Sequence, residues 1–98
     1  MAHVVGTAGS AAGLNLVLEE GGADYAVNHH SPTFLHDALA LIGSNSFDVI
    51  VESSAHFNLG DDLSALSKDG VVAVVGSRGD VAVNPRDLMA TESSVVGV

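Results

Sequence analysis

The residues of this sequence that could do chemistry gather where apolar runs end in glycine. Residues 4–7 lead into the turn Gly6-Thr7-Ala8-Gly9-Ser10, and the valine-rich residues 71–75 lead into Gly76-Ser77-Arg78. Small residues after a strand let a ligand approach the backbone closely. The ends of strands are also where open α/β sheets bind ligands. Because the chain has no cysteine, disulfides and thiolate chemistry are excluded.

Two further sets of polar side chains follow apolar runs. His29 and His30 come directly after residues 25–27, where an imidazole could hydrogen-bond to a ligand or be an ordinary solvated loop side chain. We expect no metal pair there, since neighbouring residues of a strand-like segment point apart and no third ligand is evident. Glu52 ends another run and could act as a general base, but no partner is fixed by sequence. We therefore expect Glu52 to be a carboxylate near the cleft without a catalytic role.

The periodicity of apolar residues predicts alternating strands and helices. The expected strands are residues 4–7, 25–27, 47–51, 71–75 and 94–98. The expected helices are residues 11–20, a helix from Ser31-Pro32 to residue 42, a third helix marked by Leu59, Leu63 and Leu66, and a short turn at 86–90. Alternation of this kind indicates an α/β fold with a parallel sheet and right-handed crossovers.

Capping residues locate the ends of the predicted helices. Ser10 suits the N-cap of the first helix, and Ser31 with Pro32 suits the start of the second. Asp61 and Asp62 are expected in the first turn of the third helix, where acidic residues favour the helix dipole. Gly70 is expected at the C-terminal end of that helix.

Composition limits the classes of function. The formal net charge is −9 with only three Lys and Arg residues, which argues against nucleic acid and against anionic membrane surfaces as partners. No apolar run is long enough to span a membrane, and the first residues lack the basic segment of a signal peptide. We expect one domain over residues 1–98 in a cytoplasmic protein.

Several stretches of the chain together carry a family resemblance. They are residues 5–10 with Gly13, residues 27–29, and residues 74–79 continuing to Asn-Pro-Arg-Asp-Leu-Met-Ala at 84–90. The chain resembles the zeta-crystallin type of quinone oxidoreductase, a zinc-free branch of the medium-chain dehydrogenase/reductase superfamily. The resemblance covers essentially the whole chain, and the stretch from residue 74 to residue 90 is its most specific part.

The resemblance implies an incomplete Rossmann-type parallel sheet with flanking helices, in which residues 1–98 form a partial NADPH-binding domain. The family's first strand and its Gly-rich phosphate turn precede the matching segment, and the chain contains no G-x-G-x-x-G. With that central strand missing, we expect strands 4–7 and 47–51 to pair directly in one continuous sheet, because an open slot would leave buried backbone groups unsatisfied. We also expect marginal stability.

The resemblance also implies the cofactor and its contacts. NADPH is the expected cofactor, and its expected contacts are Gly9, His29, Asn58, Val75, Gly76, Ser77 and Arg78. The turn at residues 6–10 lacks the carboxylate of NAD-preferring sites, which permits a 2′-phosphate. His30 stands where the family commonly has Arg, which removes a positive charge.

Each expected contact also has a purely structural alternative. Gly9 could serve a tight turn, Asn58 could be a helix N-cap, and Arg78 could pair with Asp80. His36 and His56 match no functional position and are expected to be surface or packing residues.

The resembled enzymes pass hydride or electrons from NADPH to quinones. No catalytic residue is expected from this segment, because the nicotinamide carries the chemistry. The isolated chain is expected to be inactive, and the full-length relative is expected to be a homo-oligomer. The alternatives are a non-catalytic truncated remnant or interaction module, and a fragment of another medium-chain reductase such as an enoyl reductase.

Overall fold

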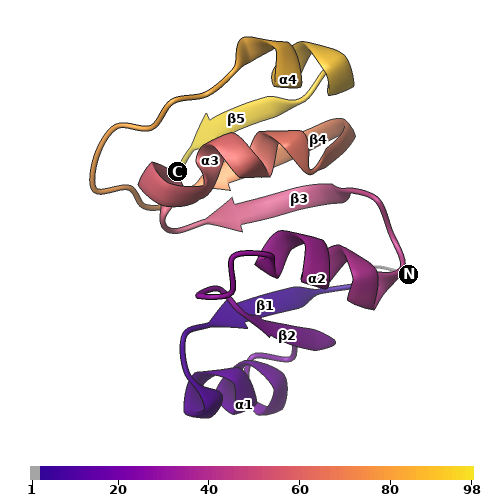
Figure 1. Ribbon diagram of the computed structural model, residues 1–98, viewed down its shortest axis with the longest axis vertical. Helices are drawn as coiled ribbons and strands as arrows, with labels where there is room; N and C mark the ends of the chain where they lie inside the picture. Colours follow the sequence, from indigo (N-terminus) through magenta and orange to yellow (C-terminus); the bar gives the residue numbers. More distant parts are fainter. Residues whose placement is uncertain (1–2) are drawn as a thin grey trace. The chain divides into compact units, whose positions relative to one another are not determined.

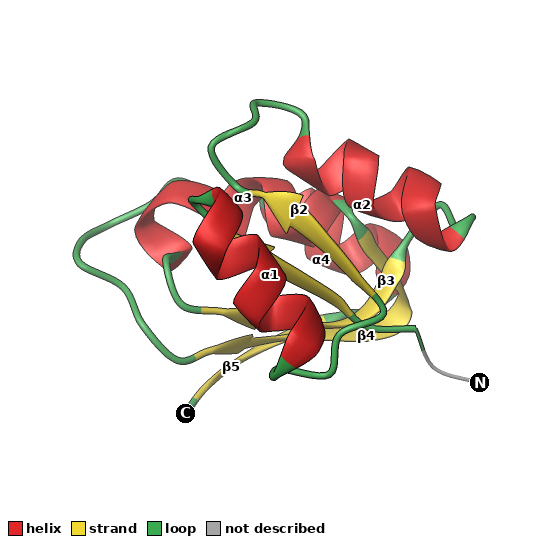
Figure 2. Cartoon of the chain, turned by 90° about the horizontal axis from the view of Figure 1, so that it is seen from below, coloured by secondary structure: helices red, strands yellow, loops and turns green. Residues whose placement is uncertain are grey.

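The computed structural model describes residues 3–98, and the chain divides into two compact units, Met1–Ser44 and Asn45–Val98. The first unit contains β1 (Val5–Ala8), α1 (Ala11–Glu19), β2 (Tyr25–Asn28) and α2 (Phe34–Ile42) (Figure 1). The second contains β3 (Phe47–Glu52), α3 (Ala55–Ser64), β4 (Leu66–Val74), α4 (Pro85–Thr91) and β5 (Ser94–Gly97). Strands and helices therefore alternate as the sequence predicts (Figure 2). None of the helices among residues 3–98 is long and apolar enough to cross a bilayer.

The first unit is built on a parallel pair of strands. β1 pairs with β2 so that Val5 lies opposite Tyr25 and Ala8 lies opposite Asn28. Helix α1 packs on both strands and begins at the predicted N-cap, where Oγ of Ser10 accepts a hydrogen bond of 3.1 Å from the Gly13 amide. That hydrogen bond satisfies one of the amides that a helix N-terminus leaves without a partner.

Helix α2 starts later than expected. Its N-cap is Thr33, and Ser31 belongs to a turn in which its amide donates to the carbonyl of Asn28 at 3.1 Å. The prediction of Ser31 as N-cap was therefore wrong, because a turn that closes on β2 takes up Ser31-Pro32. The hydroxyl of Thr33 donates to Asp37 Oδ2 at 3.2 Å, and Gly43 ends the helix with φ of 64°.

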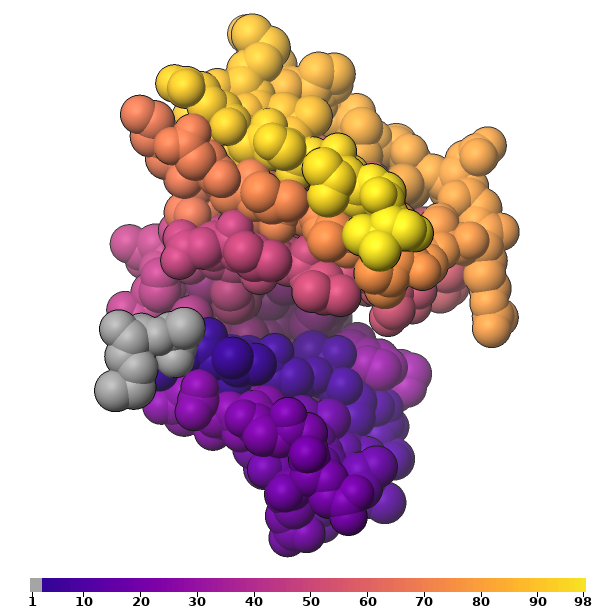
Figure 3. All heavy atoms as spheres, turned by 180° about the vertical axis from the view of Figure 1, so that it is seen from behind, coloured from indigo at the N-terminus to yellow at the C-terminus, as the bar shows by residue number. Residues whose placement is uncertain are grey.

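The second unit is a three-stranded parallel sheet in the order β3-β4-β5. Helices α3 and α4 both pack on β4 and also on each other, so they cover the same face of the sheet. The core beneath them consists of Leu63, Leu66 and Val72, with Ile50, Leu59, Val74 and Leu88 packed around it. The residues of β5 are exposed, and its atoms lie uncovered on the face seen in Figure 3.

The boundary between α3 and β4 differs from the prediction. Helix α3 ends at Ser64, so Leu66 and Gly70 lie in β4 and Asp62 lies near the C-terminal end of the helix. Leu66 was expected to be buried as part of the helix. It is the first residue of β4, and it is still buried in the core with Leu63 and Val72. Apolar spacing alone could not distinguish a helix that continues from one that ends in a buried strand.

The expected continuous sheet is wrong. Among the described residues β1 pairs only with β2, and β3 pairs only with β4, so the strands form two separate sheets. The expectation assumed that an unpaired edge of β3 would be buried. Instead Val49 is 64% exposed and Val51 is 69% exposed, so β3 is not buried as that expectation assumed.

Candidate functional site

The parallel strands place the predicted site residues at the carboxyl ends of the sheets. In the first unit β1 and β2 end side by side at Ala8 and Asn28. In the second unit Glu52 of β3 lies opposite Val74 of β4. The segments that follow these strand ends form two clusters, one in each unit.

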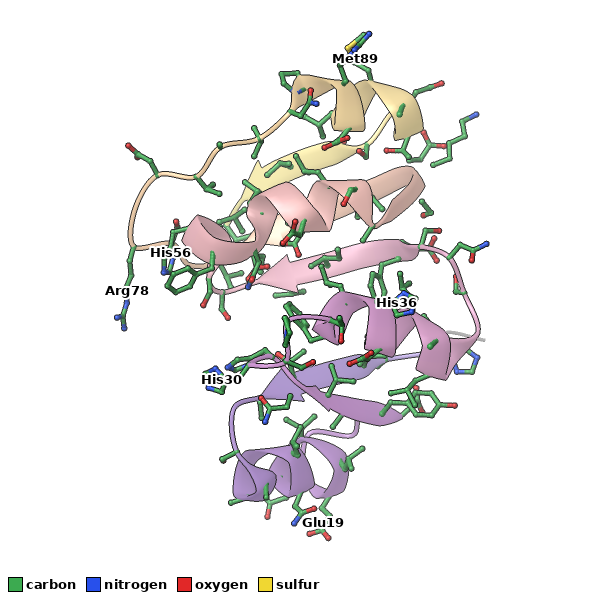
Figure 4. The ribbon with its side chains drawn as sticks, viewed as in Figure 1. Glu19, His30, His36, His56, Arg78 and Met89 are labelled. Atoms are coloured by element: carbon green, nitrogen blue, oxygen red, sulfur yellow. The ribbon has the colours of Figure 1, made fainter. Side chains whose placement is uncertain are left out.

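Gly9, His29 and His30 form the cluster of the first unit, which we call the glycine–histidine cluster. A methyl group built on Gly9 would lie 2.6 Å from Nε2 of His30 and 3.2 Å from Nε2 of His29. The two imidazole rings lie edge to face, with their centroids 4.7 Å apart. Both histidines are exposed, and His30 points outward in Figure 4. Both imidazoles therefore contact the space that only a glycine leaves open.

The expectation that the two histidines point apart is wrong, because they form a turn rather than the end of a strand. The amide of His29 donates to the carbonyl of Ala8 at 3.2 Å. The amide of His30 then donates to Oδ1 of Asn28 at 2.9 Å, which closes a side-chain turn. This turn brings both rings to Gly9.

The first unit also has an unusual charge pattern. All three cationic residues, Lys68, Arg78 and Arg86, lie in the second unit. The turn at residues 6–10 carries no carboxylate. Histidine is therefore the only side chain of residues 3–44 that can supply positive charge to an anion.

In the second unit, the segments that follow β3 and β4 are held together through their backbones. The amide of Val75 donates to the carbonyl of Glu52 at 2.9 Å, and the amide of Ala55 donates to the carbonyl of Gly76 at 3.1 Å. A side chain on Gly76 would place its Cβ only 2.7 Å from the carbonyl oxygen of Ser53. Glycine is thus required at position 76 by the close approach of two backbones.

His56 fixes the next part of this loop. Its Nδ1 accepts a hydrogen bond of 3.1 Å from the Arg78 amide, and the centroid of its ring lies 4.2 Å from the centroid of the Phe57 ring. The Arg78 side chain extends outward, as Figure 4 shows, and within the described residues it forms no ion pair with Asp80. His56 was expected to be a surface or packing residue, and the structure adds that it holds the loop after β4 through the Arg78 amide. Its partner lies 22 residues away, so no local pattern could have identified it.

Asn58 lies in the first turn of α3, but it is not the N-cap, which is Ser54. Its Nδ2 donates to Oε2 of Glu52 at 3.3 Å, and the amide of Ser54 donates to the same oxygen at 2.9 Å. Glu52 is buried, with 7% of its surface exposed. The carboxylate of Glu52 therefore ties the start of α3 to the end of β3.

A second acid lies against Glu52. Asp62 is 1% exposed, and its Oδ2 has no hydrogen-bond donor among the described N–H and hydroxyl groups. Burial raises the pKa of Asp62 to about 9, assisted by its hydrogen bond with Glu52 and by the charges of Glu52 and Asp61. Burial by itself would raise the pKa of Glu52. Hydrogen bonds from Asp62, Ser54 and Asn58 lower this pKa by more than burial raises it, so the pKa of Glu52 lies below its ordinary value. Near neutral pH the pair thus holds one proton, on Asp62.

Comparison with known proteins identifies the family. All of residues 1–98 match the family described as zinc-binding dehydrogenase. The chain belongs to this family. Among residues 3–98, no three His, Asp or Glu side chains gather closely enough to hold a metal ion. The described residues therefore do not fit a zinc site.

Within the zinc-binding dehydrogenase family, the chain is similar to quinone oxidoreductases. It is 46% identical to that of Pongo abelii and 44% identical to that of Homo sapiens, over 95 residues in each case. These matches cover 97% of this chain and 29% of each relative, so the chain spans less than a third of their length. The resemblance seen in the sequence is confirmed.

Solved structures of dehydrogenases share the fold. The quinone oxidoreductase of Thermus thermophilus, solved alone and with NADPH, superposes with a TM-score of 0.77 at 21% identity, covering 98% of this chain and 29% of that one. Benzyl alcohol dehydrogenase of Acinetobacter calcoaceticus superposes with a TM-score of 0.84 at 19% identity, covering 99% and 27%. The α/β fold class with parallel sheets and flanking helices is confirmed.

Proposed function

We propose that this chain is part of an NADPH-dependent quinone oxidoreductase and contributes part of the NADPH site. When bound, NADPH supplies the hydride or electrons that reduce the quinone. The glycine–histidine cluster carries this proposal, because it joins an open backbone position to two imidazoles without a nearby turn carboxylate. The identity of 46% with a quinone oxidoreductase supports the choice of acceptor.

The proposed contacts divide between the two units. Gly9 and His29 serve the adenosine end of the cofactor, with the imidazole as a hydrogen-bond donor or stacking surface. The nicotinamide end is served by Val75, Gly76, Ser77 and Arg78, and Asn58 is a further contact of the cofactor. In this arrangement the chain binds and orients the cofactor, and it contributes no group that reacts with the quinone. A cytoplasmic, homo-oligomeric full-length protein stays a prediction.

The 2′-phosphate assignment can be tested at Ser10. Asp and Asn both cap helices as well as Ser does, so Ser10→Asp adds a negative charge beside Gly9 while the cap of α1 is kept. We expect Ser10→Asp to weaken NADPH binding by roughly fivefold, or about 1 kcal/mol, through charge repulsion in exposed surroundings. NADH binding should change little, because NADH lacks the 2′-phosphate.

The measurement is a fluorescence titration of both cofactors with the parent chain, Ser10→Asp and the neutral control Ser10→Asn. The control should keep the parent's ratio of NADPH to NADH affinity. Equal weakening of both cofactors by Ser10→Asp would contradict the assignment of the 2′-phosphate to this turn. Failure of the parent chain to bind either cofactor would contradict the proposed contribution to the site.

A further inference from the structure

The orientation of the Asn58 amide is set by an acid. An ionised carboxylate only accepts hydrogen bonds, so the group that faces Oε2 of Glu52 at 3.3 Å must be the NH₂ of Asn58. The carbonyl oxygen Oδ1 of Asn58 is then its remaining acceptor, and no donor in residues 3–98 bonds to it. If the Asn58 amide were turned the other way, its Oδ1 would face Oε2 of Glu52, and two hydrogen-bond acceptors would lie together.

Glu52 can act in this way only if the second buried acid is neutral. Two ionised carboxyl groups in one dry site repel each other strongly, and one proton shared between them removes that repulsion. A protonated Asp62 donates to Glu52, and Oε2 of Glu52 remains available to the amides of Ser54 and Asn58. The unpartnered Oδ2 of Asp62 fits a group that lacks the donors an ionised carboxylate needs.

We propose that Asp62 is a positioning residue, which shares a proton with Glu52 and thereby fixes the Asn58 amide with its carbonyl oxygen available to a ligand. The orientation of Asn58 is independent of which ligand binds. The consequence for cofactor affinity rests on the proposed function, because it requires Asn58 to contact NADPH.

Other charged groups near the pair determine its response to pH. His56 lowers the pKa of Glu52 through its charge, and Asp61 raises the pKa of Asp62. Glu52 is the charged residue of β3 that raises the pKa of Asp62. The remaining charged residues of the elements packed on α3 are Asp48 on β3, Lys68 and Asp69 on β4, and Arg86, Asp87 and Glu92 on or beside α4. As pH rises through the value of about 9 for the pKa of Asp62, the shared proton is lost and the Asn58 amide is released.

The first test observes Asn58 directly in the chain without cofactor. The side-chain NH₂ resonances of Asn58 are followed by NMR from pH 6 to pH 10 in the parent, Asp62→Asn and Asp61→Asn. The parent should show one step near pH 9, and Asp62→Asn should show none, because its amide donates to Glu52 and does not titrate. Asp61→Asn is the matched control, an exposed acid next in sequence, and should keep the step at slightly lower pH.

A parent without the step, or Asp62→Asn with it, would overturn the proposal. A second test titrates NADPH at pH 7 and pH 9.8. Affinity should fall about tenfold for the parent and for Asp61→Asn at the higher pH, but less than twofold for Asp62→Asn. An equal fall in all three chains counts against positioning. If none of them binds NADPH at pH 7, the proposed function fails, while the Asn58 resonances still decide the role of Asp62.

Discussion

At the residue scale, the glycine–histidine cluster depends on the absence of one methyl group. Both imidazoles approach the position that a Cβ of residue 9 would occupy, and Nε2 of His30 is the nearer at 2.6 Å. The neighbouring atoms are the ends of two exposed side chains, which can rotate away at little cost. A side chain at position 9 would therefore move the two rings, and it would change the free energy of unfolding of the unit very little.

We predict that Gly9→Ala displaces the His29 and His30 rings and weakens NADPH binding several-fold. The free energy of unfolding should change by less than about 1 kcal/mol, because the site is exposed. Cofactor titration and chemical denaturation measure the two quantities. Gly97→Ala is the matched control, since a methyl group there meets no atom within 4 Å. Unchanged NADPH affinity in Gly9→Ala would count against the cluster as a binding site.

Residues at strand ends could be placed from sequence, whereas their partners could not. The order of elements predicts that Gly9 and His29 follow neighbouring strands, and the structure places them in contact. Asp62 was predicted to favour a helix dipole, yet it lies ten residues from Glu52 and bonds with it in the core. That pairing depends on where α3 begins, because a helix that starts at Ala55 places Asp62 near its C-terminal end and not in its first turn.

At the scale of elements, the turn after β3 and the turn after β4 act as one structure. The carbonyl of Gly76 accepts from the amide of Ala55, and the carbonyl of Ser53 lies where a Cβ of residue 76 would be. Backbone atoms fixed by neighbouring strands cannot move aside as a flexible side chain can. A side chain at position 76 must therefore push the two turns apart.

We predict that Gly76→Ala lowers the free energy of unfolding by about 1–3 kcal/mol, the usual cost of forcing atoms into a filled space. Urea denaturation followed by circular dichroism measures this loss. Gly79→Ala, three residues along the same loop, has open space around its Cβ and should cost far less. Equal destabilisation by the two variants would show that the loss comes from removing glycine from the loop and not from the contact with Ser53.

The order of strands and helices was predictable because each apolar run is bounded by clear turn residues. The start of α2 and the end of α3 were not. Ser31 has the side chain of an N-cap but is used in a turn against Asn28, and Leu66 continues a helical spacing from within β4. In the first case a local turn competes with the helix signal. In the second case a tertiary contact, the pairing of Leu66 with Phe47, overrides it.

At the scale of the whole molecule, the two units have unequal cores. Within residues 3–44 the buried apolar residues are Val27 and Ala38. The second unit buries Leu63, Leu66 and Val72 together. Burying large aliphatic side chains contributes about 1.5–3 kcal/mol each, so most of the apolar stabilisation lies in the second unit.

We predict that the first unit opens more readily than the second. Hydrogen exchange should show amides of β2 with protection at least tenfold lower than amides of β4, a difference of about 1.4 kcal/mol in opening free energy. Exchange rates corrected for each residue's intrinsic rate give the comparison. Equal protection in both strands would contradict this prediction. One cooperative melt at high temperature would contradict it and also the expectation of marginal stability.

The exposed valines of β3 have a consequence for the chain in solution. Val49 and Val51 lie on an edge strand, a kind of surface that adheres to other strands. A net charge of −9 keeps separate molecules apart at low ionic strength. Salt at 0.1 M shortens the reach of this repulsion to about 10 Å. The chain should therefore stay dispersed in dilute buffer and turn cloudy when sodium chloride is added.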